Sequence, residues 1–324
     1  MSKQRPPKIA ILYPGDMEVR KQATPDNNRL SSVFQALKDV GLEAEPAVYS
    51  DEFCDEVREQ LLKVDGVLVW RNPIQDGSDR SVLDPILREV SDSGVFVSTH
   101  PDVIMKIGTK EVLYSTREMG WGCDTHIYPN LSKLQETLPT LLASGPRVLK
   151  QFRGNGGNGV WRVELADNSE PATPEATVLV RHAKKGELEQ TMRLAEVFTL
   201  CEPYFADGGK MIDQQFQSRI QDGMVRCYLT QDKVVGFGHQ EINALFPASD
   251  KEDPTSAPLP TKRLYYPPDK PDFRLSNKTW NNRGYPKCKP SSISPETTFP
   301  CSGIATSCLA PKMIREMTHM YSAK

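Results

Sequence analysis

The chain has 324 residues, of which 38% are hydrophobic and 25% are charged, so it is long enough for about two domains and apolar enough to bury a core. Its 40 Lys and Arg residues nearly balance 42 Asp and Glu residues, and the net charge of −2 argues against binding nucleic acid through bulk positive charge. No apolar stretch reaches the roughly 18 residues of a membrane span, and the polar N-terminus lacks a signal-peptide core, so we expect a cytoplasmic protein and no membrane partner.

The first hundred residues alternate between continuous apolar runs and amphipathic segments. The runs at residues 9–13 and 66–70 have no polar interruption, as in strands that are covered on both faces. Residues 30–40 have the pattern of a helix, and Gly41 stands where a glycine commonly ends one. This alternation predicts an open, parallel α/β layer over residues 1–103.

Residues 148–164 carry the most informative pattern of the chain. An apolar run that contains a lysine leads into Arg-Gly-Asn-Gly-Gly-Asn-Gly, and a second β-prone run begins at Val160. Gly and Asn tolerate positive φ and leave backbone N–H groups free, so such a loop can enclose a polyphosphate while the lysine adds a point charge. The basic and glycine residues of this predicted phosphate loop are Lys150, Arg153, Gly154, Gly156, Gly157 and Gly159.

Other glycine-rich phosphate loops fit this pattern less well. Gly154, Gly156 and Gly159 match Gly-x-Gly-x-x-Gly, but the dinucleotide fingerprint requires a helix after the glycines, and here a strand-like run follows. The kinase motifs His-Arg-Asp and Asp-Phe-Gly do not occur, nor does the Walker Gly-Lys-Ser/Thr. A tight hairpin with a glycine turn stays open as the alternative, although hairpin loops of about two to five residues have no need of so many glycines beside two basic residues.

The order of motifs around the loop resembles the ATP-grasp superfamily, whose members include D-alanine–D-alanine ligase, glutathione synthetase and the ribosomal-protein glutamate ligases. The resemblance covers residues 8–245. It implies an α/β fold with α+β lobes, in which the N-terminal open parallel layer is followed by a two-lobed ATP-grasp-like domain. The expected parts are a pre-ATP-grasp domain at 1–103, a first lobe with the glycine loop at 104–199, an incomplete second lobe at 200–246, and a linker with an irregular tail at 247–324.

The resemblance also implies nucleotide-binding roles outside the loop. Lys110 stands where the opening helix of the family, here expected over residues 107–120, carries its first nucleotide-binding lysine. Gln214 and Gln215 correspond to the hinge strand, whose backbone and polar side chains meet the adenine. Taken alone, each of these residues could equally be a solvated surface residue, so their assignment depends on their order around the loop.

The second lobe is where the sequence departs from the family. Strands at residues 225–229 and 233–238 resemble the arginine-bearing strand pair, and Arg226 would then point at the phosphates. The family holds two Mg²⁺ ions with an acidic residue and a later Glu-x-Asn, because Mg²⁺ prefers oxygen ligands. Glu241 and Asn243 match Glu-x-Asn but follow the second strand directly, without an acidic strand before them, so a chance match is the competing interpretation.

Residues 271–324 differ in composition from the rest of the chain. They contain 8 Lys or Arg, 3 Asp or Glu and 6 Pro, which gives them a net charge of +5 and leaves −7 for the remainder. We expect this tail to pack against nothing and to leave the strand at 233–238 with an open edge. A permitted choice of codons gives an acidic, strand-like stretch in a shifted frame over residues 303–314. We therefore hypothesise that the tail is frameshifted or mis-spliced and that the metal ligands were lost with the original sequence.

The implied function is ATP-dependent ligation of a carboxylate to an amine through an acyl phosphate, with ATP, Mg²⁺, a small acid and an amine as partners. In such a reaction the protein mainly positions reactants and neutralises charge. Two alternatives stay open, namely a nucleotide-binding protein without catalysis and a plain α/β binding scaffold without a nucleotide site. Phosphate release from ATP separates the first two, and nucleotide binding separates the last.

Overall fold

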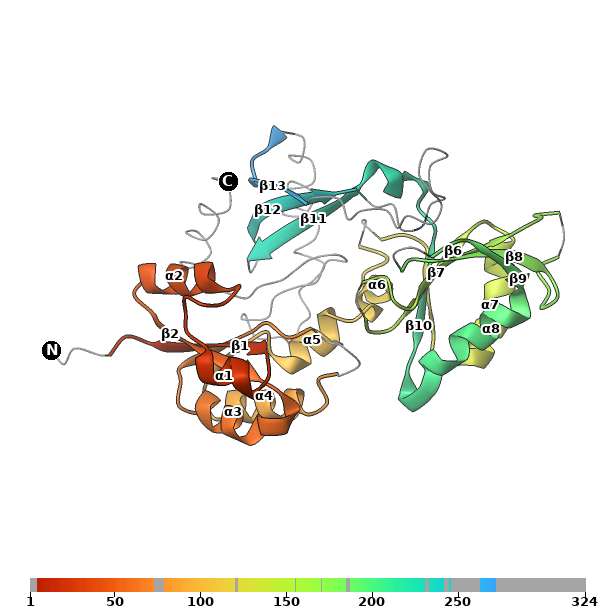
Figure 1. The fold of residues 1–324 in the computed structure, drawn as a ribbon. Helices are drawn as coiled ribbons and strands as arrows, with labels where there is room; N and C mark the ends of the chain where they lie inside the picture. Colours follow the sequence, from red (N-terminus) through yellow and green to blue (C-terminus); the bar gives the residue numbers. More distant parts are fainter. Residues whose placement is uncertain are drawn as a thin grey trace.

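The computed structural model describes residues 5–72, 79–119, 122–154, 156–169, 171–184, 187–230, 233–241, 245 and 263–271. Within these residues the strands form three sheets, which follow one another along the chain and are coloured red to orange, yellow-green to green, and teal to blue in Figure 1. No helix in the described part of the chain is long and apolar enough to cross a lipid bilayer.

The N-terminal unit, residues 5–98, is built on a four-stranded parallel sheet with the order β2-β1-β3-β4. Its strands are β1 (Lys8–Pro14), β2 (Glu43–Tyr49), β3 (Gly66–Val69) and β4 (Phe96–Ser98). Its helices are α1 (Met17–Gln22), α2 (Ser31–Asp39), α3 (Cys54–Leu61) and α4 (Leu83–Asp92), with a 3₁₀ helix at Asp51–Phe53. The predicted open parallel layer is therefore confirmed.

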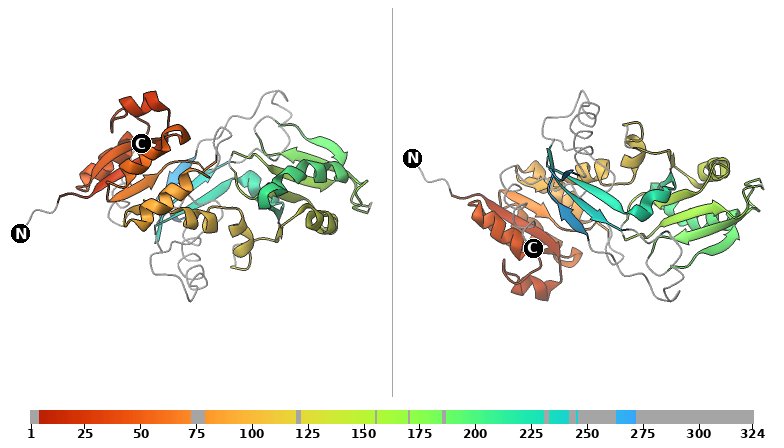
Figure 2. Two further views of the ribbon diagram at one scale, coloured as in Figure 1. Left: turned by 90° about the horizontal axis from the view of Figure 1, so that it is seen from below. Right: turned by 90° about the horizontal axis from the view of Figure 1, so that it is seen from above.

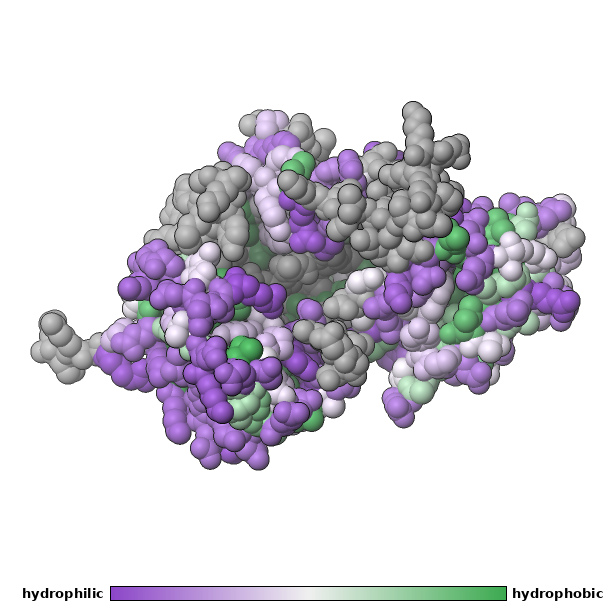
Figure 3. Space-filling model, in the orientation of Figure 1, coloured by the Kyte–Doolittle hydropathy of each residue, from purple (hydrophilic) through white to green (hydrophobic). Residues whose placement is uncertain are grey.

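Hydrophobic clusters cover both faces of this sheet, which explains the uninterrupted apolar runs of its strands. Leu12 packs with residues of α3 and α4 on one face, and Ile11 packs with Phe34 and Leu37 of α2 on the other. Gly41, at φ +81°, follows the end of α2 as expected. Figure 3 shows hydrophilic residues over most of the visible surface of this unit, with apolar residues in small separate patches.

Two short helices, α5 (Pro101–Ile107) and α6 (Glu111–Ser115), connect the N-terminal unit to the next sheet. The prediction of a single helix over residues 107–120 is wrong. Helix α5 ends at Ile107, and the next helix begins only at Glu111. Lys110 therefore stands at the N-terminal boundary of α6. Its backbone N–H donates a 3.0 Å hydrogen bond to the carbonyl of Phe152 beside the glycine loop, and this contact fixes the break.

The second sheet has six antiparallel strands in the order β5-β10-β6-β7-β8-β9. Its strands are β5 (Thr125–Tyr128), β6 (Arg147–Gln151), β7 (Val160–Leu165), β8 (Thr177–His182), β9 (Gln190–Arg193) and β10 (Met211–Gln215). The helices α7 (Leu131–Leu142) and α8 (Leu194–Cys201) pack their apolar faces into its core, and a 3₁₀ helix spans Glu202–Gly208. Since β10 lies between β5 and β6, the hinge strand belongs to this sheet, and the expected boundary after residue 199 falls inside α8.

The third sheet consists of β11 (Met224–Thr230), β12 (Lys233–Gln240) and β13 (Leu264–Tyr266), and a 3₁₀ helix at Ser218–Asp222 precedes it. The predicted pairing of β11 with β12 is confirmed, and it is antiparallel. The prediction of an open edge at β12 is wrong. Strand β13 pairs with β12 at Phe237, Gly238 and His239. Tyr266 of β13 packs against the small cluster of Cys227, Val234 and Phe237, which holds the added strand in place.

The third sheet lies nearer to the N-terminal unit than the bulk of the six-stranded sheet does, as the views in Figures 1 and 2 agree. Val235 of β12 packs against the cluster that contains Ile11 and Phe34. The six-stranded sheet occupies the far end of the elongated molecule, and the glycine loop between β6 and β7 starts next to α6. This arrangement places the loop in contact with elements that precede it by more than forty residues.

Candidate functional site

The glycine loop between β6 and β7 has the backbone conformation that its sequence predicts. Gly154, Gly156, Gly157 and Gly159 all have positive φ, at 153°, 64°, 81° and 63°. A Cβ atom at Gly157 would lie 2.3 Å from the carbonyl oxygen of Ala183, and one at Gly159 would lie 2.6 Å from the side chain of Gln151. Glycine is therefore required at these two positions for space as well as for conformation.

Side chains on β6 and β8 hold the loop. Gln151 donates a 2.8 Å hydrogen bond from Nε2 to the carbonyl of Asn158, and its backbone N–H donates to the carbonyl of Gly159 at 2.7 Å. The backbone N–H of Gly159 also donates to Nε2 of His182 at 3.2 Å. Burial lowers the pKa of His182, which favours the neutral ring that can accept this bond, and the ring stacks on Trp161 at 5.0 Å. The sequence singled out neither Gln151 nor His182 for this role.

Lys110 and Lys150, here called the lysine pair, approach the loop from α6 and β6. The ammonium group of Lys110 donates to the carbonyl oxygen of Gly154 at 3.2 Å, and that of Lys150 donates to Oε1 of Gln214. Burial, together with repulsion from Lys150, lowers the pKa of Lys110 to about 8, and burial also lowers the pKa of Lys150. In the described part of the chain neither lysine forms an ion pair with a carboxylate, so the pair carries local positive charge.

Gln214 connects the lysine pair to the hinge strand β10. Its Nε2 donates to Oγ1 of Thr125 at 3.1 Å and contacts Sγ of Cys123 at 3.2 Å, and these bonds present its Oε1 to Lys150. Successive side chains on a strand point to opposite faces, and Gln215 is exposed. The structure therefore brings together Lys110, Lys150, the glycine loop and Gln214, and it does not bring Gln215 into the same group.

A buried charged network fixes β10 between β5 and β6 directly behind this group. Asp213 is fully buried and accepts hydrogen bonds from Nε of Arg147 at 2.8 Å and from the hydroxyl of Tyr128 at 2.7 Å. Burial raises the pKa of the Asp213 carboxyl, and the guanidinium of Arg147 opposes that shift. Arg147 also pairs with Asp124 at the start of β5. The network determines where the neighbouring Gln214 side chain lies.

Arg153 and Arg226, both predicted to meet phosphates, lie in different surroundings. Arg153 has its Nη2 atom 3.7 Å from Oδ2 of Asp84 in α4, so it faces the N-terminal unit. Arg226 lies on β11 opposite Gly238, where burial and the positive charge of Arg263 lower its pKa. Arg263 adjoins β13 in a stretch that the sequence assigned to a linker, which is why it was missed.

The predicted metal ligands are not assembled in the described part of the chain. Glu241 directly follows β12, and Asn243 lies outside the described residues. No group of three His, Cys, Asp or Glu side chains that could hold a metal ion occurs within the described residues. The described residues alone therefore do not make up the two-ion magnesium site that the resemblance implies.

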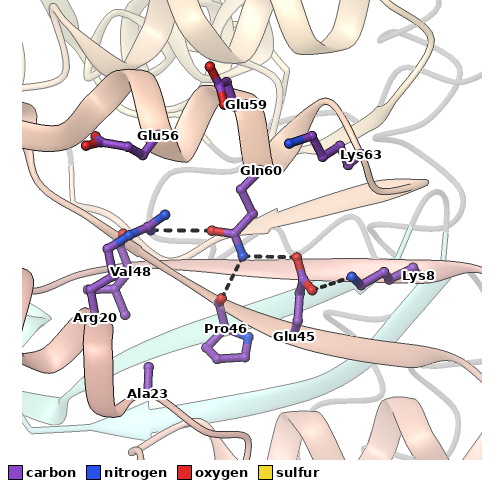
Figure 4. A pocket seen from close by; sticks show the side chains of 10 residues that line it. All are labelled: Lys8, Arg20, Ala23, Glu45, Pro46, Val48, Glu56, Glu59, Gln60 and Lys63. Atoms are coloured by element: carbon purple, nitrogen blue, oxygen red, sulfur yellow. Dashed lines mark hydrogen bonds and ion pairs between the residues drawn. The ribbon is translucent and has the colours of Figure 1, made fainter.

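A pocket of about 430 Å³ lies apart from these residues, on the N-terminal unit beside the edge strand β2 (Figure 4). Its polar side chains bind one another. Gln60 donates to Glu45 at 3.0 Å and accepts from Arg20 at 3.4 Å, and Lys8 pairs with Glu45. None of the residues that line it belongs to the predicted nucleotide site, so it does not bear on that site.

Comparison with known proteins shows the fold. No protein-family model matches the sequence, and neither does any curated protein. The crystal structure of D-cycloserine synthetase DcsG is similar to this chain with a TM-score of 0.56 at 12% identity, over 97% of this chain and 99% of that chain. A RimK domain ATP-grasp protein from Sphaerobacter thermophilus matches with a TM-score of 0.43 at 14% identity, over 75% of this chain and 76% of that one. The likeness to the synthetase structure shows a shared overall fold, in agreement with the fold class that the sequence predicts.

Proposed function

We propose that the chain binds ATP at the glycine loop and the lysine pair and uses it to join a carboxylate to an amine. Its motifs resemble those of the ATP-grasp superfamily, and its fold is similar to that of a synthetase. The observation that carries this proposal is the position of the two ammonium groups. They are half-buried, they are close enough to repel each other, and they lie beside a loop of four glycines with positive φ.

The lysine pair and the loop supply what a triphosphate needs. An anion between Lys110 and Lys150 would offset their mutual repulsion, and a hydrogen bond to a charged group contributes about 1.5–3 kcal/mol. Backbone N–H groups of the four glycines add neutral donors without side chains in the way. In this proposal Gln214 orients Lys150, Gln215 contacts the adenine, and Arg226 reaches the phosphates from the third sheet, with Arg263 beside it.

In the proposed reaction an oxygen of the substrate carboxylate attacks the γ-phosphorus of ATP, and the bond from that phosphorus to the bridging oxygen breaks to release ADP. The nitrogen of the amine then attacks the carbonyl carbon of the acyl phosphate. A C–N bond forms, the C–O bond to phosphate breaks, and the amine loses a proton. The chain's own residues bind, orient and neutralise charge, and no nucleophilic side chain is required. Since the described residues do not fit a magnesium site, no step is assigned to a metal.

The solved neighbour agrees with this class of reaction. It is a synthetase, and its chain corresponds to the present one over nearly the full length of both. At 12% identity this likeness extends to the fold alone, so the identity of the acid and of the amine has to come from the chain's own residues.

Phosphate release from ATP tests the proposal. The full chain is incubated with ATP, Mg²⁺ and pools of small acids and amines, and the same assay is run on Lys150→Ala and on Lys38→Ala. Lys38 is an exposed lysine of α2, which makes it a matched control. We expect substrate-dependent release with the wild type and with Lys38→Ala, and release lower by about tenfold or more with Lys150→Ala. Nucleotide binding without release in any pool would favour a non-catalytic nucleotide-binding protein instead.

A further inference from the structure

A second group of basic side chains lies where the N-terminal unit meets the glycine loop. Arg71 follows the carboxyl end of β3, Arg80 precedes α4, and Arg153 directly precedes the first glycine of the loop. These three residues are here called the arginine cluster. Arg80 and Arg153 approach the carboxylate of Asp84 on α4, and Arg71 adjoins Arg80, whose Nη1 donates to the Arg71 carbonyl at 3.4 Å. None of them belongs to the lysine pair, although Arg153 adjoins Gly154, whose carbonyl binds Lys110.

Several donor atoms of the arginine cluster are buried without a hydrogen bond. The Arg80 side chain is only 2% exposed, and its Nε donates to Asp84 at 2.7 Å, whereas its Nη2 has no partner among the described residues. The same holds for Nε of Arg71 and for Nε and Nη2 of Arg153. Buried polar groups are nearly always hydrogen-bonded in native proteins, and a missing bond to a charged group is costly. The cluster therefore presents donors that an external acceptor would satisfy.

The charges of the cluster are not balanced by its own carboxylate. Asp84 accepts a close hydrogen bond from Arg80, and it lies 3.7 Å from Arg153, beyond hydrogen-bond distance. Asp79 is also near, but it is exposed and binds the backbone of Ser81. Burial lowers the pKa of Arg80, and repulsion from Arg153 and Arg71 adds to that shift. The guanidinium groups of Arg80 and Arg153 thus share one buried carboxylate, and that of Arg71 adds a third positive charge beside them, which favours a bound anion.

The position of the cluster in the sheet is also that of a ligand site. In the order β2-β1-β3-β4, β2 lies on one side of β1 and β3 lies on the other. The direction in which strands are added therefore reverses between β2 and β3. In open parallel sheets, ligands bind outside the carboxyl ends of the strands at such a reversal. Arg71 lies just beyond the carboxyl end of β3, and Arg153 of the six-stranded unit faces the same place through Asp84.

We propose that the arginine cluster binds an oxyanion of the acid substrate, either a carboxylate or a phosphate group that takes no part in the reaction. Guanidinium groups bind both anions through paired hydrogen bonds in a fixed geometry. The assignment of the anion to a ligase substrate rests on the proposed function, but the binding of an oxyanion does not. Arg153 thereby has a substrate role in place of the nucleotide role predicted for it.

Direct titration of the full chain tests this site. Succinate and inorganic phosphate are the probes, succinamide is the neutral control for succinate, and ionic strength is held constant with chloride. The variants are Arg71→Gln, which leaves the ion pair of Arg80 and Asp84 intact, and Arg80→Lys. The second variant keeps the positive charge but lacks the paired N–H donors of a guanidinium group. Arg29→Gln, at an exposed arginine of the same unit, is the matched control. Binding of ATP with Mg²⁺ is measured on the same samples.

We expect succinate or phosphate to bind the wild type and Arg29→Gln equally, and to bind Arg71→Gln and Arg80→Lys about tenfold more weakly or worse. The tighter of the two probes identifies the kind of acid, and succinamide should not bind. Absence of binding by both anions, or equal binding by wild type and Arg71→Gln, would overturn the proposal. Arg71→Gln should bind ATP as the wild type does. If the wild type binds succinate or phosphate but does not bind ATP, the result would contradict the proposed function and leave the oxyanion site standing.

Discussion

At the scale of single residues, Lys110 predicts a pH dependence of nucleotide binding. Its pKa of about 8 means that its ammonium group is charged below pH 8 and becomes neutral above it. Phosphates bind the charged form more tightly, so ATP affinity should fall by only about twofold from pH 7 to 8 and then by up to about tenfold for each further pH unit. Calorimetry at several pH values, with proton uptake measured above pH 8, checks this.

The Lys110→Gln variant serves as the control for this titration, because it removes the group that loses its charge. Its ATP affinity should be lower than that of the wild type at pH 7 and should fall less steeply with pH between 8 and 9.5, where any remaining dependence comes from Lys150. A wild-type affinity that stays flat over the same range would show that Lys110 does not contact the phosphates.

A second prediction at this scale concerns Asp213 and the free energy of unfolding. Replacing Asp213 with Ala leaves Arg147 in the core of the six-stranded sheet without the fully buried carboxylate that accepts from its Nε. Breaking a buried ion pair from one side costs about 3–5 kcal/mol of unfolding free energy. Asp92→Ala, at an exposed position of α4, should change it by no more than about 0.5 kcal/mol. Urea unfolding measures both, and a loss below about 1 kcal/mol for Asp213→Ala would contradict the role of the network.

The sequence alone identified some of these residues and not others, for a physical reason. Lys150 stood out because it lies four residues before the first glycine of a glycine-rich stretch, which is a local pattern. The partners of Asp213 could not be found in this way, since Arg147 is 66 residues away along the chain and meets it only through the pairing of β6 with β10. Arg71 and Arg80 had no local motif at all, and their significance depends on the contact of Arg153 with Asp84.

At the scale of elements, the glycine loop allows a matched pair of substitutions. Gly157→Ala places a Cβ atom 2.3 Å from the carbonyl of Ala183, so the loop has to move. Gly156→Ala also occurs at positive φ, but the nearest atom is 3.9 Å away, so it costs only about 1 kcal/mol of backbone strain. We expect ATP affinity to fall about tenfold or more with Gly157→Ala and much less with Gly156→Ala. Similar affinities for both variants would argue against a role for the loop shape.

The third sheet also leads to a prediction about where trypsin cleaves the chain. Arg263 directly precedes β13, and its Nη2 donates a 3.2 Å hydrogen bond to Oε1 of Gln240. Trypsin should therefore cleave there slowly. By composition, the first cuts are expected at Arg274, Lys278 and Arg283, which lie outside the described residues, and the resistant fragment should then retain β13. Mass spectrometry of the digest identifies its end. Early cleavage at Arg263 would show that β13 does not stably close the sheet.

Elements with strong local patterns were predictable, and short ones were not. The apolar runs of β1 and β3 and the glycine loop follow directly from residue type. The three-residue strand β13 lies in a stretch rich in Pro and Asp, and only pairing with β12 makes it a strand. The break between α5 and α6 likewise depends on the hydrogen bond of Lys110 to Phe152, a contact between distant segments.

At the scale of the whole molecule, contacts among the described residues tie the N-terminal unit to the second and third sheets. Arg153 reaches Asp84 from the glycine loop, and Val235 of the third sheet packs on the cluster around α2. The proposed oxyanion site contains the contact of Arg153 with Asp84, and the proposed nucleotide site adjoins it at Gly154, which would hold ATP and acid close together. Proximity of this kind is a large part of catalysis when the protein supplies no nucleophile.

The hypothesis of a shifted reading frame also belongs to this scale, and it concerns residues outside the described part of the chain. Sequencing the transcript across codons 270–285 tests it. We expect an insertion, deletion or altered splice junction there, because the composition of the chain changes at that point. A single intact frame through this region would overturn the hypothesis and leave the tail as a genuine part of the protein.

The central claim is that ATP binds at the lysine pair, and calorimetric titration of the full chain with ATP and Mg²⁺ at pH 7 tests it most directly. We predict that the wild type and Lys38→Ala bind ATP with the same affinity, because Lys38 is exposed on α2. We predict that Lys150→Ala binds about tenfold more weakly or worse, since it removes a charged donor from the phosphate site. Equal affinities for Lys150→Ala and the wild type would contradict the account.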